Sequence, residues 1–133
     1  MWIDGDAKDN ISSNLELIFS GVDPKEANVE YRRKVINGTK AILLVLNGKD
    51  LEDEITTLEE FQAVGALIQN FQLLAFEAGL GTCIKTRLFT GKLAEYIGVQ
   101  ANEMCTAAIT LGYYETLPKG VVRIKAEDKL TIL

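Results

Sequence analysis

The sequence contains no histidine, and this absence excludes several classes of site. Serine–histidine and cysteine–histidine catalytic pairs need an imidazole base, and most zinc sites use at least one imidazole ligand. Cysteine is scarce as well: only Cys83 and Cys105 occur, in apolar surroundings and without the spacing of metal ligands. We expect buried, reduced thiols, as suits a cytoplasmic protein, with a disulfide or a redox role as the alternative.

Basic residues are in the minority, 14 against 19 acidic ones, so the net charge is −5. A negatively charged chain is a poor partner for a phosphate backbone, and we expect no nucleic acid. The first ten residues carry neither a basic region nor an apolar stretch, so no signal peptide is expected. At 133 residues, 47% of them apolar, the chain is expected to form one soluble domain, 1–133, without a membrane span.

A long apolar helix, predicted over 57–78, organises the rest of the chain. Thr57 and Glu60 have the spacing of a capping box, and Gly79 ends the helix. Apolar residues recur at helical spacing and form a broad stripe: Phe61, Val64, Ile68, Phe71 and Ala75, with Leu67, Leu74 and Ala78. A helix that is apolar over most of its circumference is normally buried on two sides. Because a domain of this size offers one core, we expect the second side to face another copy of the chain.

Periodicity and flanking turn residues indicate the other elements. The predictions are helices over 8–20, 24–36 and 88–97, and strands over 40–46, 82–85 and 105–112. Asp23 and Pro24 supply an N-cap and a first-turn proline for the second helix. The first and third strands are continuous apolar runs, which favours an interior position. The side chains expected to point inward from the first and last helices are Ile11, Leu15, Ile18 and Phe19, and Phe89, Leu93, Tyr96 and Ile97.

Two charged runs and the C-terminal segment complete the chain. The basic run 32–34 is compatible with an anion site, but Glu26 and Glu30 one turn away favour a solvated helix face. The acidic loop 47–54 fits no metal-binding spacing, and a solvated turn is favoured over a metal site made from Asp50, Glu52, Asp53 and Glu54. Residues 113–133 are predicted to form an arm, basic in its middle and apolar at its end.

Three stretches together resemble the C-terminal two thirds of the FMN-dependent nitroreductase family. They are the strand KAILLVL at 40–46, the helix and turn ALIQNFQLLAFEAGLGTC at 66–83, and KLAEYIGVQANEMCTAAITLGYYE at 92–115, and the resemblance extends over roughly 36–119. It implies an α+β fold with a mostly antiparallel sheet flanked by helices and a long central helix at a homodimer interface. It also implies one FMN in each interface pocket, reduced by NAD(P)H.

The resemblance further implies the residues at the cofactor. The turn Gly79-Leu80-Gly81 leads into the strand that would run under the flavin, which places there Ile84, Lys85, Thr86 and Arg87. The stretch 116–119 is similar to the family's basic C-terminal segment, so Lys119 is implied at the phosphate, with Arg123 or Lys125 as further candidates. A phosphate dianion requires such cations. The same glycine turn, however, serves any reversal from helix to strand, so a purely structural role stays open.

The opening motifs of the family are not found in this sequence. Members begin with an Arg-Arg-Ser helix that holds the FMN phosphate and a Pro-Ser-x-x-Asn-x-Gln-Pro-Trp segment that contacts the flavin, and only Met1-Trp2 corresponds to its end. We therefore expect a chain that starts late, as a fragment or as a naturally short relative. Two functions remain open: hydride transfer through FMN from NAD(P)H to a nitro compound, quinone or similar small molecule, and a flavin-free binding or structural dimer.

Overall fold

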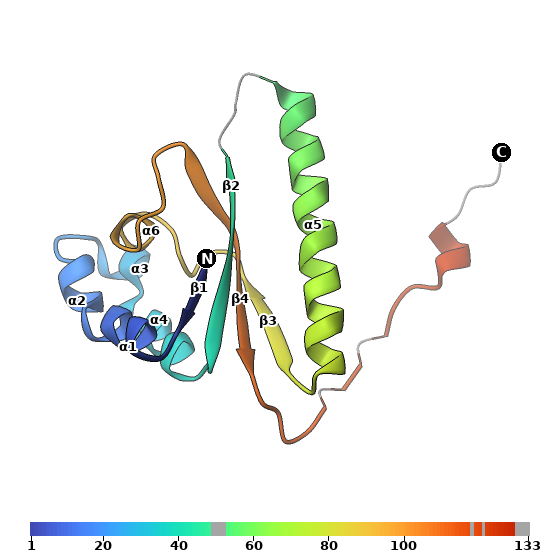
Figure 1. Cartoon of the computed structure of the whole chain (residues 1–133), viewed down its shortest axis with the longest axis horizontal. Helices are drawn as coiled ribbons and strands as arrows, with labels where there is room; N and C mark the ends of the chain where they lie inside the picture. The colour runs from blue at the N-terminus through green and yellow to red at the C-terminus, as the bar shows by residue number, and fades with distance from the viewer. Residues whose placement is uncertain (49–52, 118, 121, 130–133) are drawn as a thin grey trace.

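The computed structural model describes residues 1–48, 53–117, 119–120 and 122–129, and its centre is an antiparallel sheet. The strands are β1 (Trp2–Asp4), β2 (Ala41–Gly48), β3 (Gly81–Lys85) and β4 (Glu103–Gly112), in the order β1-β2-β4-β3. A group of short helices covers one face and a single long helix covers the other (Figure 1). The expected α+β architecture is therefore present, with β1 as a strand that the sequence patterns did not predict.

The short helices are more broken than the periodicity indicated. They are α1 (Gly5–Ser13), α2 (Leu15–Ile18), α3 (Pro24–Ala27), α4 (Val29–Asn37) and α6 (Lys92–Tyr96). The helix predicted over 24–36 divides at Asn28, which adopts a left-handed conformation with φ of 40°, one that asparagine tolerates better than most residues. The predicted N-cap is confirmed, since the Asp23 carboxylate accepts a hydrogen bond from the amide of Lys25 at 2.8 Å.

The main core lies between these short helices and the sheet. Periodicity identified its residues correctly, because Ile11, Leu15, Ile18 and Phe19 are all buried together with Ile42 and Leu44 of β2, Ala108 of β4, and Leu88, Phe89 and Leu93. The prediction for Tyr96 was wrong: it lies at the end of α6 and is 45% exposed. Residues 88–91 precede α6 as a turn, so the helix predicted over 88–97 is only five residues long.

The long helix α5 (Glu54–Glu77) begins earlier than predicted. Its N-cap is Asp53, whose carboxylate accepts hydrogen bonds from the amide of Ile55 at 3.0 Å and the hydroxyl of Thr56 at 2.6 Å, so the capping box predicted at Thr57 is not the start. These hydrogen bonds hold the pKa of Asp53 below its usual value. Gly79, with φ of 76°, allows the chain to leave the helix in a conformation that favours glycine.

One stripe of α5 packs on the sheet, and much of the remainder is exposed. Val64, Ile68 and Phe71 cover a small second cluster whose buried members are Val45, Ala107 and Ile109. Large apolar side chains on the rest of the helix are exposed: Ile55, Leu58, Phe61, Leu67, Leu73, Leu74 and Phe76. Only Ala75 among the residues of α5 is fully buried. An apolar hollow of about 800 Å³ lies beside this surface, between α5 and β2.

The remaining segments add little regular structure. After β4 the chain runs along the surface, and within the described part of the predicted arm it forms one short helical turn, η1 (Ala126–Lys129). The apolar end at 130–133 lies outside the described residues, as do Asp50 and Glu52 of the acidic loop. Among the residues that the structure describes, no helix is both long and apolar enough to cross a membrane.

Candidate functional site

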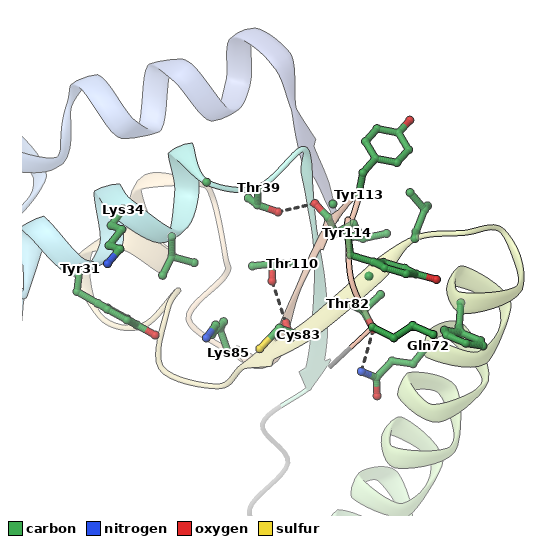
Figure 2. A pocket seen from close by; sticks show the side chains of 18 of the residues that line it. Tyr31, Lys34, Thr39, Gln72, Thr82, Cys83, Lys85, Thr110, Tyr113 and Tyr114 are labelled. Atoms are coloured by element: carbon green, nitrogen blue, oxygen red, sulfur yellow. Dashed lines mark hydrogen bonds between the residues drawn. The ribbon is translucent and has the colours of Figure 1, made fainter. Parts of the chain in front are cut away.

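A large hollow lies at the outer edge of β3 and has a volume of about 1140 Å³. Since β3 is an edge strand, the hollow reaches both layers of helices: α4 borders it on one side and the end of α5 on the other (Figure 2). The end of β4 and the segment after it complete the walls. Small-molecule sites typically measure roughly 300–1,000 Å³, so this hollow is large enough for a cofactor.

The charge of the walls is opposite to that of the whole chain. Three cations line the hollow, Lys34, Lys85 and Arg123, and no described lining residue is an aspartate or glutamate. This composition contrasts with the excess of acidic residues in the complete sequence. A concave surface lined by one sign of charge attracts ligands of the opposite sign. The hollow is therefore suited to an anionic ligand.

Lys85 lies at the end of β3 beside two other polar side chains of the hollow. The Cys83 thiol, on the same face of the strand, is its main partner, and Tyr31 approaches from α4 (Figure 2). The hydrogen bond with Cys83, followed by electrostatic interactions with Cys83 and Tyr31, raises the pKa of the Lys85 ammonium above its usual value. This shift favours the charged ammonium still further over the neutral amine.

Side-chain hydrogen bonds fix the strands that border the hollow. The Thr110 hydroxyl of β4 donates to the carbonyl of Cys83 at 3.1 Å, and the Thr39 hydroxyl donates to the carbonyl of Leu111 at 2.6 Å. On the α5 side, the Gln72 amide donates to the hydroxyl of Thr82 at 3.1 Å (Figure 2). These bonds tie β3 to β4 and to α5, and β4 to the segment before β2, so the polar groups of the hollow are held by regular secondary structure.

Gly81 allows the wall of the hollow to close. A β-carbon at this position would stand 3.1 Å from Cδ1 of Tyr114, closer than ordinary van der Waals contact. The glycine at the start of β3 thus lets the aromatic ring after β4 lie against the strand. This packing gives the Gly-Leu-Gly turn a specific structural role beyond the reversal of the chain.

The structure brings together four of the residues implied by resemblance: Leu80, Gly81, Lys85 and Arg123 line the hollow. The others do not line it. Gly79 belongs to the turn before it, and Ile84, which pairs with Ile109, lies on the face of the sheet that α5 covers. Thr86 and Arg87 follow β3, and Lys119 is exposed outside the hollow. Alternation along the strand explains why Lys85 enters the hollow and its neighbour Ile84 does not.

Sequence reasoning missed Tyr31 as a member of the site, and it weighed Lys34 only within the basic run 32–34, for which a solvated face was favoured over an anion site. They reach the hollow because α4 packs next to the end of β3, a contact between segments far apart in the chain. Their spacing of three residues places both on one helix face, and this was the available signal. The thiol of Cys83, expected to be buried, is exposed at the hollow instead, while Cys105 is half-buried; both are free thiols.

The basic run 32–34, predicted to be a solvated face, divides among three environments. Lys34 lines the hollow, and Arg33 forms an ion pair with Glu16 of α2 instead of with an acidic residue of its own helix. Arg32 contradicts the prediction most clearly, because it is only 6% exposed. Helical rotation of about 100° per residue separates adjacent side chains, so a run of like charges cannot share one environment.

No group of three or more candidate ligands among the described residues could hold a metal ion. The expectation that the acidic loop is not a metal site is tested only in part, since residues 49–52 lie outside the described chain. Asp53, at the end of that loop, caps α5. The hollow offers cations, tyrosines, the Cys83 thiol, and uncharged polar side chains and backbone groups.

Comparison with known proteins places this geometry in a family. The nitroreductase family model matches residues 6–113. The Bacillus subtilis (strain 168) protein named "Putative NAD(P)H nitroreductase YfhC" is 32% identical over 111 residues, a match that covers 82% of this chain and 57% of that protein. The chain thus spans a little more than half the length of this relative.

Solved structures show the same fold. The nitroreductase-like family protein from Bacillus cereus is 25% identical with a TM-score of 0.81, covering 100% of this chain and 71% of that one. The FMN- and NADPH-dependent nitroreductase NfnB from Sphigopyxis sp. strain HMH is 11% identical with a TM-score of 0.69, covering 100% and 78%. The nitroreductase with bound FMN from Bacteroides fragilis NCTC 9343 is 18% identical with a TM-score of 0.66, covering 99% and 73%. By its sequence match and its fold, this chain belongs to the nitroreductase family.

Proposed function

We propose that the chain contributes to an oxidoreductase that binds FMN in the hollow at the edge of β3 and takes electrons from NAD(P)H. The observation that carries this proposal is the large hollow lined by cations, with no acidic residue in its described lining. Family membership supports the same conclusion, since NfnB is an FMN- and NADPH-dependent enzyme. The acceptor would be a nitro compound, a quinone or a similar small molecule.

The residues of the hollow fit the chemical parts of FMN. Lys34, Lys85 and Arg123 offer positive charge for a phosphate, and charge-assisted hydrogen bonds to phosphate are among the stronger polar interactions. Tyr31, Tyr113 and Tyr114 offer aromatic surface for a flat ring system. FMN, when bound, would supply the hydride chemistry, so that no side-chain acid or base is required. The absence of histidine is therefore compatible with the proposed activity.

The role of this chain's own side chains is to bind and orient. Lys85 offers a cation at the end of β3, beside Cys83 and Tyr31. The hydrogen bond from Thr110 to the carbonyl of Cys83 holds that part of the strand against β4. Lys119, implied by resemblance, would add a further cation from the segment after β4, which also carries Arg123. We propose that Lys119 acts on the phosphate from outside the walls described above.

We expect this chain by itself to bind FMN weakly. The sequence has no Arg-Arg-Ser helix, so neutralisation of the phosphate depends on a few lysines and arginines at exposed positions. Each missing charge-assisted contact costs roughly 1.5–3 kcal/mol, and the loss of two or three raises a sub-micromolar Kd toward millimolar. The purified protein should be colourless, and oxidation of NAD(P)H should appear only with excess FMN.

Fluorescence titration with FMN, followed by NAD(P)H oxidation assays with nitro and quinone acceptors, tests the proposal. Saturable binding with an FMN-dependent rate is expected. Lys119→Ala should weaken binding about 10- to 100-fold, while Lys129→Ala serves as the matched control on η1 and should have little effect. The absence of any FMN-dependent fluorescence change or NAD(P)H oxidation, even with FMN in large excess, would contradict the function. A yellow protein that keeps FMN through dialysis would contradict the predicted weakness.

The exposed surface of α5 favours a second proposal, homodimer formation. Seven large apolar side chains of this helix remain exposed in a single chain, beside the apolar hollow next to β2. Contiguous apolar surface of this kind marks interaction sites in soluble proteins. Should FMN fail to bind, this surface would support the alternative function, a binding or structural dimer. Sedimentation at micromolar concentration distinguishes a homodimer from a monomer.

A further inference from the structure

Arg32 of α4 is a buried cation without a carboxylate partner in the described chain. It is only 6% exposed, and the sole ion pair among the described residues joins Arg33 to Glu16. Burial lowers the pKa of the Arg32 guanidinium, although arginine stays protonated in proteins. A buried charge is tolerated only where hydrogen bonds compensate for the lost water. The acceptors of Arg32 therefore identify what the residue holds in place.

These acceptors are backbone carbonyls from two distant segments. Nε donates to the carbonyl of Ala27 at 2.8 Å, at the end of α3. Nη1 donates to the carbonyl of Arg87 at 3.2 Å and also to that of Leu88. The guanidinium carbon lies 4.7 Å above the centre of the Phe19 ring, a cation–π distance. Arg32 thus joins the short-helix layer to the segment that follows β3.

The segment held by Arg32 is the turn directly after Lys85. The amide of Leu88 donates to the carbonyl of Lys85 at 3.4 Å, so residues 85–88 form a turn whose other end Arg32 grips. The side chain before Arg32, Tyr31, approaches the Lys85 ammonium itself. Two adjacent residues of α4 therefore meet this region: Tyr31 approaches the side chain of Lys85, and the guanidinium of Arg32 binds carbonyls of the turn that follows.

We propose that Arg32 is a positioning residue, which holds the 85–88 turn against α4 and so keeps Lys85 beside Cys83 and Tyr31 in the hollow. The planar guanidinium suits this role, because its donors point in fixed directions toward two segments at once. A lysine ammonium keeps the charge, but it is a compact group whose donors do not point in fixed directions toward two segments. The consequence for ligand binding, weaker binding when Arg32 is replaced, rests on the proposed FMN function.

The alkylation rate of Cys83 reports the position of Lys85 without any cofactor. Cys83 is exposed, and the neighbouring Lys85 ammonium attracts the anionic alkylating reagent iodoacetate toward its thiol. Lys85→Met should slow alkylation of Cys83 about fivefold, the effect of removing one unit charge close by. Arg32→Met should slow it by a similar factor. In the double variant the two effects should not add, because both act through the same ammonium.

Two internal controls separate positioning from general loosening. Arg33→Met changes the half-buried neighbour that pairs with Glu16 and should leave the rate at Cys83 unchanged. Cys105 is half-buried, so its rate, measured in the same digests by mass spectrometry, rises if the fold opens. Positioning predicts slower alkylation of Cys83 with no change at Cys105. If Arg32→Met does not fold, Arg32→Lys replaces it, with the same direction of change expected.

Three results would overturn the proposal: an unchanged rate at Cys83 in the Arg32 variants, a fully additive effect in the double variant, or an unchanged rate in Lys85→Met. FMN titration of the same proteins adds a separate readout. Arg32→Met and Lys85→Met should raise the Kd for FMN by similar factors. Failure of the wild-type chain to bind FMN would count against the proposed function alone, since the alkylation cycle involves no flavin.

Discussion

The two faces of the sheet are buried to different degrees. On the face covered by short helices, the core contains thirteen fully buried residues drawn from α1 to α4, the sheet and the segment around α6. On the face covered by α5, only Val45, Ala107 and Ile109 form the buried cluster, with partly buried side chains of the helix against them. Five broken helices thus bury more apolar surface than one long, continuous helix.

This difference shows that regular secondary structure and burial are separate properties. The short helices are individually too short to be stable in water, so they depend on the core that they form together. The helix α5 is long enough to have its own stability, and one stripe suffices to hold it on the sheet. Its remaining apolar surface is available to a partner. Variants on the two faces should therefore behave differently.

The largest contrast is expected between two phenylalanines. Phe89 is 1% exposed in the main core, whereas Phe76 of α5 is 58% exposed. Phe89→Ala should lower the free energy of unfolding by about 3–5 kcal/mol, because it leaves a cavity, and Phe76→Ala by less than about 1 kcal/mol in a monomer. Urea unfolding at low protein concentration measures both. Equal losses would mean that the α5 face is as complete as the other.

A charge on the exposed face of α5 distinguishes a monomer from a dimer. Leu74 is 65% exposed in the single chain, so Leu74→Glu should leave the fold intact. In a dimer that buries Leu74, the same unpaired charge should cost several kcal/mol and separate the subunits. Sedimentation of both proteins at micromolar concentration tests this. A wild type that is already a stable monomer would remove the homodimer proposal.

Adjacent residues of β3 offer a finer comparison, because they point to opposite faces. Lys85 enters the hollow and Ile84 lies on the α5 face. Lys85→Ala should raise the Kd for FMN roughly 10- to 100-fold through the loss of a charge-assisted contact, and Ile84→Ala should change it little. Fluorescence titration of the two variants decides. A larger effect at Ile84 would place the ligand on the other face of the strand.

The smallest effect is expected at the start of α5 and depends on pH. Hydrogen bonds from Thr56 and Ile55 lower the pKa of Asp53, so the folded state favours the ionised carboxylate. Its contribution is present above the ordinary carboxyl pKa of about 4 and is lost as the pH falls through the lowered folded value. The small Tm difference between wild type and Asp53→Ala should therefore shrink in acid. Glu54→Ala is the control.

Local sequence patterns predicted the helices, the strands and their inward-facing residues, but they missed the contacts between segments that are distant in the sequence. The inward residues of the first helix were correct although that helix is broken, because burial follows the apolar stripe more closely than helix continuity does. The predicted strand positions were nearly correct because the strands, too, follow the apolar runs of the sequence. The three-residue β1 was missed, since so short a run carries no periodic signal.

The candidate site shows the limit most clearly. Lys85 was found through the family resemblance, but Tyr31 and Lys34 reach the hollow only because α4 packs beside β3. The sequence alone also could not show that in the run 32–34 Arg32 is buried, Arg33 is ion-paired and Lys34 lines the hollow. Which neighbour a charged side chain meets depends on tertiary contacts, and these connect residues more than fifty positions apart.

The place of β3 at the margin of the sheet also sets how quickly its backbone opens. Within the described chain, β4 is the one strand that pairs with it, so amides on its outer side have no strand partner. Such amides exchange hydrogen for deuterium much faster than those of β4, which is paired on both sides. The strand that carries the candidate site is thus among the least protected in the sheet. A ligand or second subunit seated there would be detected first as slower exchange along β3.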